Sequence, residues 1–218
     1  MASATTSDLH LKSPEHQRHD LFNMVTLPIV IMVNIAAIRT FFFGGAVVDD
    51  KILDNAWNWQ IVTLHSYILL DTLFIGLCPS CVAAPTTVIA HHIVVFFGWL
   101  AVPHIYIQGR PIATCLLSCE INTFFMIARK FQPFQKYSSL LGLLKFFFYL
   151  TWVPLRLVIF PYCCYLSFFL ARDFYIEMKT LVNIASLGLI LLILMTCLNV
   201  KWSYDLLLAN LKKKGHVS

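Results

Sequence analysis

The chain has 218 residues, of which 59% are hydrophobic and only 12% carry a charge, with a formal net charge of +5. An ordinary soluble domain is about 25% charged, so this composition excludes a soluble globular fold and indicates a protein that crosses a membrane several times. We therefore expect membrane lipids as its partners and no nucleic acid.

Six apolar segments approach the roughly 20 residues that a helix needs to cross the hydrocarbon core of a bilayer. In chain order they are Leu21–Phe43, Trp59–Cys78, Pro85–Ile107, Ile112–Ala128, Lys145–Leu170 and Leu181–Val200. We predict an all-α fold: one polytopic membrane helix bundle of about six transmembrane helices over residues 21–208. A polar N-terminal tail (1–20) and a basic C-terminal tail (209–218) flank it.

Two prolines, Pro154 and Pro161, interrupt the fifth segment. Cutting the segment there would give seven passes instead of six. We keep six, because prolines in a helix bundle kink spanning helices more often than they end them.

Basic residues outside the segments favour one orientation of the bundle. With six passes, both tails share a side with the even-numbered loops, and that side holds nine basic residues against four. The nine are Lys12, Arg18, Arg129, Lys130, Lys136, Lys201, Lys212, Lys213 and Lys214, and the four are Lys51, Arg110, Arg172 and Lys179. Cytosolic loops carry the excess of lysine and arginine, so both tails are predicted to be cytosolic.

The seven cysteines form no disulfide framework, and most lie inside the apolar segments. The "CPSC" pair, Cys78 and Cys81, falls in a short loop on the predicted cytosolic side, where thiols stay reduced. Two cysteines alone cannot build a zinc site, and the chain has no Gly-rich phosphate loop. Neither a metal nor a bound cofactor is expected.

Titratable residues within the segments gather at one depth. Asp71 precedes the cytosolic end of the second segment by about seven residues, and Glu120 precedes that of the fourth by about eight. His91 and His92 follow the start of the third segment by six or seven residues. At 1.5 Å per residue, all four lie on the order of 10 Å inside the cytosolic boundary. A charge there costs about 2.5–3.5 kcal/mol, so they are expected to line one polar cavity, which is a hypothesis for a functional site.

A histidine backed by a carboxylate acts as a general base or a nucleophile, because the carboxylate orients the imidazole and stabilises its charged form. Adjacent histidines point about 100° apart on a helix, so one is expected to face the cavity and the other a neighbouring helix. The candidate catalytic residues are His91, His92, Asp71 and Glu120.

Further polar residues near this layer would contact a substrate. Basic groups on the cytosolic loop suit phosphates, which favours an amphipathic, phosphate-bearing substrate such as a phospholipid, or acyl-CoA as a co-substrate. The candidate substrate-binding residues are Asn122, Thr123, Arg129, Lys130 and Arg156.

Five blocks stand in order between about residue 60 and residue 208: "LHSYILLDTLF", "AHHIVVFF", "CEINTFFMIARKF", "PLRLVIFPYCCY" and "CLNVKWSYDLL". Together they resemble the TLC-domain family, which includes the ceramide synthases and a set of small TLC-domain-containing proteins. The resemblance implies a multi-helix membrane domain, usually in the endoplasmic reticulum, that acts in lipid synthesis, sensing or transport.

The family's double histidine falls on His91 and His92, its second-span aspartate on Asp71, and its acidic residue before a helix-end arginine on Glu120 and Arg129. Ceramide synthases add two aspartates after the histidine pair, whereas this chain has none between His92 and Glu120. The nearer likeness is therefore to the small TLC-domain proteins, which implies a role in lipid homeostasis and puts sphingoid-base acylation in doubt.

Three functions fit these residues. The first is a lipid acyltransferase-like enzyme, and the second is a protein that binds or traffics lipids without turnover. The third is a proton-coupled transporter, for which an Asp/His/Glu relay would be natural. The absence of an inverted repeat in the sequence places the transporter last. The sequence leaves open whether the protein is an enzyme.

Overall fold

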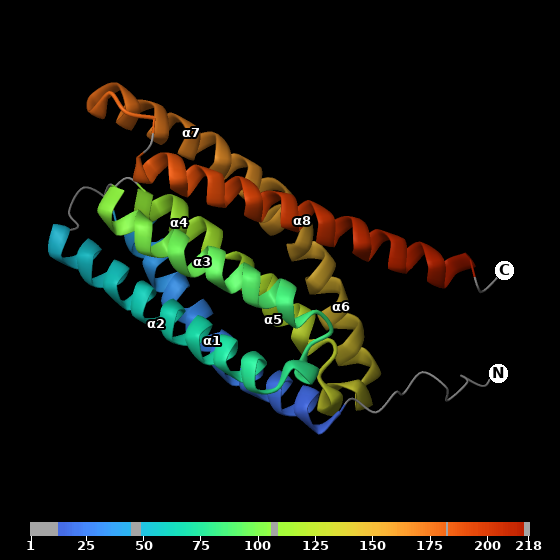
Figure 1. The fold of residues 1–218 in the computed structure, drawn as a ribbon. Coiled ribbons are helices and arrows are strands. Elements are labelled where there is room, and N and C mark those ends of the chain that lie inside the picture. Colours follow the sequence, from blue (N-terminus) through green and yellow to red (C-terminus); the bar gives the residue numbers. More distant parts are fainter. Residues whose placement is uncertain (1–12, 45–48, 106–108, 182, 216–218) are drawn as a thin grey trace.

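Every regular element in the described residues, 13–44, 49–105, 109–181 and 183–215 of a computed structural model, is helical (Figure 1). The α-helices are α1 (Pro14–Phe43), α2 (Asp50–Leu77), α3 (Pro85–Ile105), α4 (Gly109–Leu117), α5 (Cys119–Ala128), α6 (Ser138–Trp152), α7 (Ile159–Met178) and α8 (Ile184–Gly215). Two short 3₁₀ turns, η3 (Pro79–Cys81) and η4 (Gln132–Lys136), lie in loops, and a π-helical turn, η5 (Val153–Val158), joins α6 to α7.

Local signals explain where the first two helices begin. The Ser13 side chain accepts a hydrogen bond from the His16 N–H, and Pro14 takes the first helical position, where its missing N–H costs nothing. The Asp49 carboxylate likewise accepts from the Lys51 N–H at the start of α2. Both helices thus begin several residues before their most apolar stretches.

These helices cross the bundle six times within the described part of the chain. α1, α2, α3 and α8 each make one pass, α4 and α5 make one together, and α6, η5 and α7 form one continuous pass. Successive passes alternate in direction, so the start of α1 and the end of α8 lie at the same end of the bundle (Figure 1). This arrangement agrees with an even number of passes.

Five of the helical stretches are long and apolar enough to cross a membrane. They are Pro14–Phe43, Asp50–Leu77, Gly109–Ala128, Ser138–Met178 and Ile184–Leu208, and the apolar stretch in α3, Pro85–Leu100, is shorter. The prediction of an all-α, multi-pass membrane bundle is confirmed.

The distribution of side chains suits a lipid environment. On α1, for example, Val25 and Met32 are 60% and 63% exposed, whereas Asn23 and Asn34 are each 1% exposed. Hydrocarbon accepts apolar side chains but leaves polar groups without partners, so polar residues face the interior of the bundle.

Several helices extend beyond the predicted segments. Residues 14–20 and 209–215, assigned above to the polar tails, continue α1 and α8. The fifth pass runs from Ser138 to Met178 and does not end at either proline, so the alternative of seven passes is not supported. Residues 106 and 107 at the end of the third predicted segment lie outside the described residues.

Pro154 explains the π-turn in this long helix. A proline has no N–H for the helical ladder, and its ring clashes with the carbonyl four residues earlier. The chain responds by widening the turn, and the Ile159 N–H bonds to the Pro154 carbonyl five residues back. Such turns recur at functional sites, and this one carries Arg156 into the bundle interior.

A buried polar network joins α1 and α2 to α4 and to Ser118, the residue between α4 and α5. The Gln60 amide donates to Asn34 Oδ1, Asn34 Nδ2 donates to Ser118 Oγ at 3.2 Å, and Thr114 Oγ1 donates to Gln60 Oε1 at 2.9 Å. Each of these side chains has a hydrogen-bond partner, so the network serves to hold the helices together.

Candidate functional site

Asp71 lies in the interior between two histidines. It stands on α2 and is only 3% exposed. Its Oδ1 accepts a hydrogen bond from His19 Nε2 of α1 at 2.7 Å, and its Oδ2 lies 3.4 Å from His92 Nε2 of α3. One carboxylate therefore links three passes.

Both ring nitrogens of His92 have partners. Nε2 faces Asp71, and Nδ1 shares a 2.9 Å hydrogen bond with the Thr72 hydroxyl. Such contacts fix the orientation of the ring. Among the described residues, no group of three or more His, Cys, Asp or Glu side chains is arranged to hold a metal ion.

The Asp71 cluster continues into α1. Asn23 Nδ2 lies 3.2 Å from His19 Nε2, and Asn23 Oδ1 accepts from the Tyr67 hydroxyl at 2.9 Å. The buried side chains of Leu27, Val30 and Leu64 belong to an apolar cluster that also includes Tyr67. Leu27 and Val30 lie between Asn23 and Asn34 on α1, and Leu64 lies between Gln60 and Tyr67 on α2, where the buried His65 contacts the Ile61 and Phe96 carbonyl oxygens.

His91 points elsewhere, as the 100° step between neighbouring residues requires. It lines a partly open cavity, and its ring centroid lies 5.5 Å from that of Trp202 on α8. Its Nδ1 is enclosed and makes no hydrogen bond within the described residues. The predicted asymmetry is therefore present: His91 lines the cavity, while His92 contacts the neighbouring helix α2.

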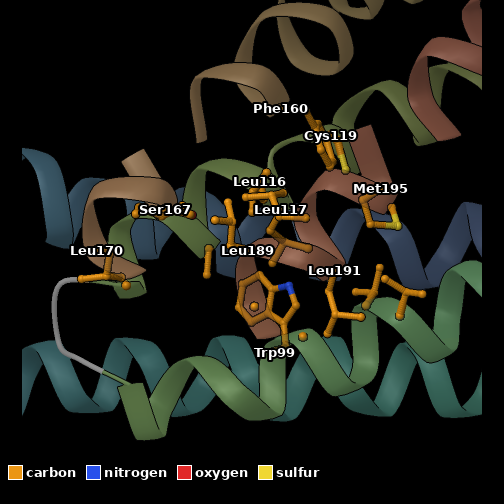
Figure 2. A pocket seen from close by; sticks show the side chains of 18 of the residues that line it. Trp99, Leu116, Leu117, Cys119, Phe160, Ser167, Leu170, Leu189, Leu191 and Met195 are labelled. Atoms are coloured by element: carbon orange, nitrogen blue, oxygen red, sulfur yellow. The ribbon is translucent and has the colours of Figure 1, made fainter. Parts of the chain in front are cut away.

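The cavity lies among α3, α4, α5, α7 and α8 and has a volume of about 120 Å³. Its walls are mostly apolar. Figure 2 shows Leu170 and Ser167 toward one end, Cys119 and Phe160 toward the other, and Trp99 along the wall between them. Glu120 also lines the cavity, so the candidate residues His91 and Glu120 share it.

The prediction of a single polar cavity is wrong in one respect. Asp71 does not line the cavity but lies in the buried cluster with His19 and His92. Equal depth placed Asp71 and Glu120 in one layer, yet their helices direct the two side chains to different sides of α3. Of the two adjacent histidines, Asp71 therefore contacts His92, which does not line the cavity.

Arg156 and its partners form a second buried cluster beside Glu120. Arg156 Nε donates to Asn122 Oδ1 at 3.0 Å, and its Nη2 donates to Thr123 Oγ1 at 2.7 Å. Its Nη1 donates to Asn199 Oδ1 of α8 at 2.9 Å. Three of the candidate substrate-binding residues, Asn122, Thr123 and Arg156, are therefore brought together.

The other two basic candidates lie elsewhere. Arg129 caps α5, and its guanidinium carbon lies 3.7 Å from the centroid of the Phe148 ring. Lys130 is exposed in the following turn. Neither residue lines the cavity.

Sequence reasoning missed several residues of this region. His19 fell in the stretch assigned to the N-terminal tail, although His19 and Asn23 follow the four-residue spacing of a helix face. Trp202 and Asn199 stood inside the quoted "CLNVKWSYDLL" block without an assigned role. No pattern in the sequence indicated that Gly98 belongs to the site, because it lines the cavity without a side chain.

Comparison with known families gives one result. A family model of the TLC domain matches residues 55–208, which include most of α2 and all elements from α3 to the main part of α8. No curated protein and no solved structure matched the chain. α1, which supplies His19, precedes the matched residues.

Proposed function

The chain belongs to the TLC-domain family, and we propose that this multi-pass membrane protein acts in lipid metabolism by binding one lipid acyl chain in the cavity that ends at His91 and Glu120. Its location would be the endoplasmic reticulum membrane, as the family resemblance implies.

The length of the cavity supports this proposal. Its lining residues extend from Phe160 to Leu170 on α7 and from Ala185 to Met195 on α8, and the first and last are ten residues apart in each case. At 1.5 Å per residue these stretches are about 15 Å long. That is half of the roughly 30 Å hydrocarbon core, which is the depth of one leaflet and so of one acyl chain. The cavity volume of about 120 Å³ encloses part of such a chain, and its apolar walls with a histidine at one end suit a chain that carries a reactive carbonyl.

Acyl transfer from acyl-CoA is the reaction that these groups would serve. An acceptor hydroxyl or amine would give its proton to the His91 imidazole, and its oxygen or nitrogen would bond to the thioester carbonyl carbon. The carbon–sulfur bond would then break, and the proton would pass from His91 to the CoA thiolate. Glu120 would supply negative charge near the imidazolium formed in between.

One observation favours a second candidate, lipid binding without turnover. No carboxylate contacts His91 within the described residues, and its Nδ1 has no partner. A general base normally has its second nitrogen held by a hydrogen bond that fixes the tautomer. In this chain the carboxylate contact belongs to His92 instead. Binding a lipid without turnover would not require a carboxylate contact to His91.

The geometry gives no support to proton-coupled transport. A relay needs polar groups in succession across the membrane. His65 lies on α2 between the Asp71 cluster and the Asn34–Gln60 network, but its two ring nitrogens contact the carbonyl oxygens of Ile61 and Phe96, so it does not link the two groups.

The cavity can be tested by filling it. A Cβ added at Gly98 would meet only Leu191 Cδ1, at 3.9 Å, so Gly98→Leu would extend a side chain into the cavity. Gly142 on α6 is exposed with nothing near it, and Gly142→Leu is the matched control. We expect purified Gly98→Leu protein to lose its co-purifying acyl lipid, measured by mass spectrometry, and Gly142→Leu to keep it. Equal lipid content in both variants would refute the acyl-chain site.

Turnover separates the two candidates. The parent protein is incubated with acyl-CoA and candidate hydroxyl or amine acceptors, and free CoA and acylated product are measured. For an enzyme, His91→Ala should lower the rate by about 10²–10⁴-fold while the fold is retained. If the parent shows no turnover and His91→Ala only reduces retained lipid, the protein is a lipid-binding protein. Full turnover in His91→Ala would exclude His91 as the base.

A further inference from the structure

Arg156 is a buried cation without an anion in contact. It is 6% exposed, and each of its three hydrogen bonds goes to a neutral oxygen, on Asn122, Thr123 or Asn199. Within the described residues no carboxylate lies within ion-pair distance of it. The rings of Trp152 and Trp202 lie 5.3 and 5.8 Å from its guanidinium carbon. A charge at this depth is costly and commonly marks a substrate or ion site.

The cluster also holds unused hydrogen-bond donors. A guanidinium has five N–H groups, one on Nε and two on each terminal nitrogen. One is used on each nitrogen, so one N–H remains on Nη1 and one on Nη2. Asn199 Nδ2 is enclosed and has no partner within the described residues, although Asn199 is fully buried. Paired N–H groups of arginine match the two oxygens of a carboxylate or phosphate.

This donor cluster lies close to the cavity. Phe160 and Met195 line the polar end of the cavity. Phe160 follows Arg156 by four residues on the fifth pass, and Met195 precedes Asn199 by four residues on α8, which is about one helical turn in each case. Figure 2 shows Phe160 and Met195 at the same end as Cys119. Trp202 stands between the two sites, since its ring contacts both His91 and the Arg156 guanidinium.

We propose that Arg156 and Asn199 bind the oxyanion head of a single-chain lipid whose alkyl chain enters the cavity, with the Trp202 ring between the two parts. This inference rests on the proposed acyl-chain site and adds the head-group chemistry. The oxyanion is a carboxylate or a phosphate monoester, because either supplies acceptors for the free N–H groups. The lining stretches of α7 and α8 are about 15 Å long and the cavity volume is about 120 Å³, which leaves no room for a second chain and favours a lipid with one chain over a diacyl lipid.

Glu120 competes with such a ligand. It lies on α5 about one turn before Thr123, which accepts a hydrogen bond from Arg156, and within the described residues its carboxylate is not within ion-pair distance of Arg156. Replacing it with glutamine keeps the shape of the side chain but removes the charge that repels an incoming oxyanion. Affinity for an anionic lipid should then rise.

Three probes that differ only in the head group test the inference: oleate, oleoyl lysophosphatidate and oleyl alcohol. Binding to the full-length protein in detergent micelles is measured for the parent, Arg156→Gln and Arg172→Gln. Arg172 lies on the same pass but is half exposed and pairs with Asp173, which makes it the matched control. Thermal unfolding confirms that each variant is folded.

The parent should bind at least one anionic probe about 10- to 100-fold more tightly than oleyl alcohol, the size that charge-assisted hydrogen bonds supply. Arg156→Gln should lose this preference and still bind the alcohol, whereas Arg172→Gln should keep it. A preference for oleate identifies a carboxylate ligand, and a preference for lysophosphatidate identifies a phosphate ligand. Equal binding of all three probes by the parent, or an unchanged preference in Arg156→Gln, overturns the inference.

Glu120→Gln gives a second test that leaves Arg156 in place and serves if Arg156→Gln does not fold. It should bind the preferred anionic probe more tightly than the parent does, and unchanged or weaker binding counts against the inference. Failure of the acyl-chain site itself gives a different result: oleyl alcohol would then bind equally to the parent and to Gly98→Leu.

Discussion

Asp71 Oδ2 lies 3.4 Å from His92 Nε2, so the buried carboxylate contacts the histidine that does not line the cavity. Its other oxygen is held by His19 from α1. Asp71 thus connects three passes. We expect substitution of Asp71 to change the stability of the bundle more than it changes the cavity.

Asp71→Asn should lower the free energy of unfolding by about 1–3 kcal/mol, because it removes the charge that both imidazoles face. The exposed pair of Lys201 and Asp205 supplies the control, since Asp205→Asn should change stability by less than about 1 kcal/mol. Thermal unfolding of both variants in the same detergent is the measurement. Equal melting temperatures would show that the Asp71 contacts contribute little.

Gln60→Ala should destabilise the bundle without changing lipid binding. The substitution leaves Asn34 Oδ1 without its donor and Thr114 Oγ1 without its acceptor on Gln60. Interhelical hydrogen bonds in membranes contribute about 0.6–2 kcal/mol each. A double-mutant cycle with Thr114→Val should give a coupling energy in that range, and a coupling energy of zero would contradict the network.

Two buried tryptophans make a matched pair for testing a single hydrogen bond. Trp152 Nε1 donates to Ser203 Oγ at 2.9 Å, whereas Trp57 Nε1 is enclosed without a partner in the described residues. Trp152→Phe should therefore cost more stability than Trp57→Phe, by about 1 kcal/mol. Unfolding midpoints of the two variants check the order, and the reverse order would show that packing outweighs the hydrogen bond.

The two ends of the chain should lie on the same side of the membrane, and that side should be the cytosol. The even number of passes and the excess of basic residues on that side motivate this expectation. Tags at the N- and C-termini should both be cleaved by protease added to selectively permeabilised cells. Cleavage of only one tag would rule out the six-pass arrangement.

A reactive thiol in the "CPSC" loop is not expected. Cys81 is buried, and this burial raises its pKa to about 11, so the thiol stays protonated near neutral pH. A maleimide reagent at pH 7 should modify Cys81 slowly compared with the thiol of an unfolded sample. Rapid modification in the folded protein would show that the loop opens.

Composition and segment length determined the fold class, because a helix of about 20 apolar residues spans the bilayer and satisfies its backbone hydrogen bonds within itself. The depth of Asp71, His91 and Glu120 in the membrane stays a prediction, since it was counted from the expected ends of the segments and the rise per residue. The step of about 100° between neighbouring residues on a helix also predicted that His91 and His92 face different neighbours. The five sequence blocks indicated the family.

Only the tertiary structure decided which way each helix faces. In a soluble protein the apolar stripe of a helix marks its inner face, but here lipid and core are both apolar, so hydrophobicity does not distinguish them. Packing between helices therefore decided that Asp71 contacts His92 and His19, that Glu120 lines the cavity with His91, and that Trp202 lies beside Arg156. A proline can either kink a helix or end it, and the sequence does not decide between the two. At Pro154 the helix continues through a π-turn, because residues of neighbouring helices hydrogen bond to Arg156 in the interior.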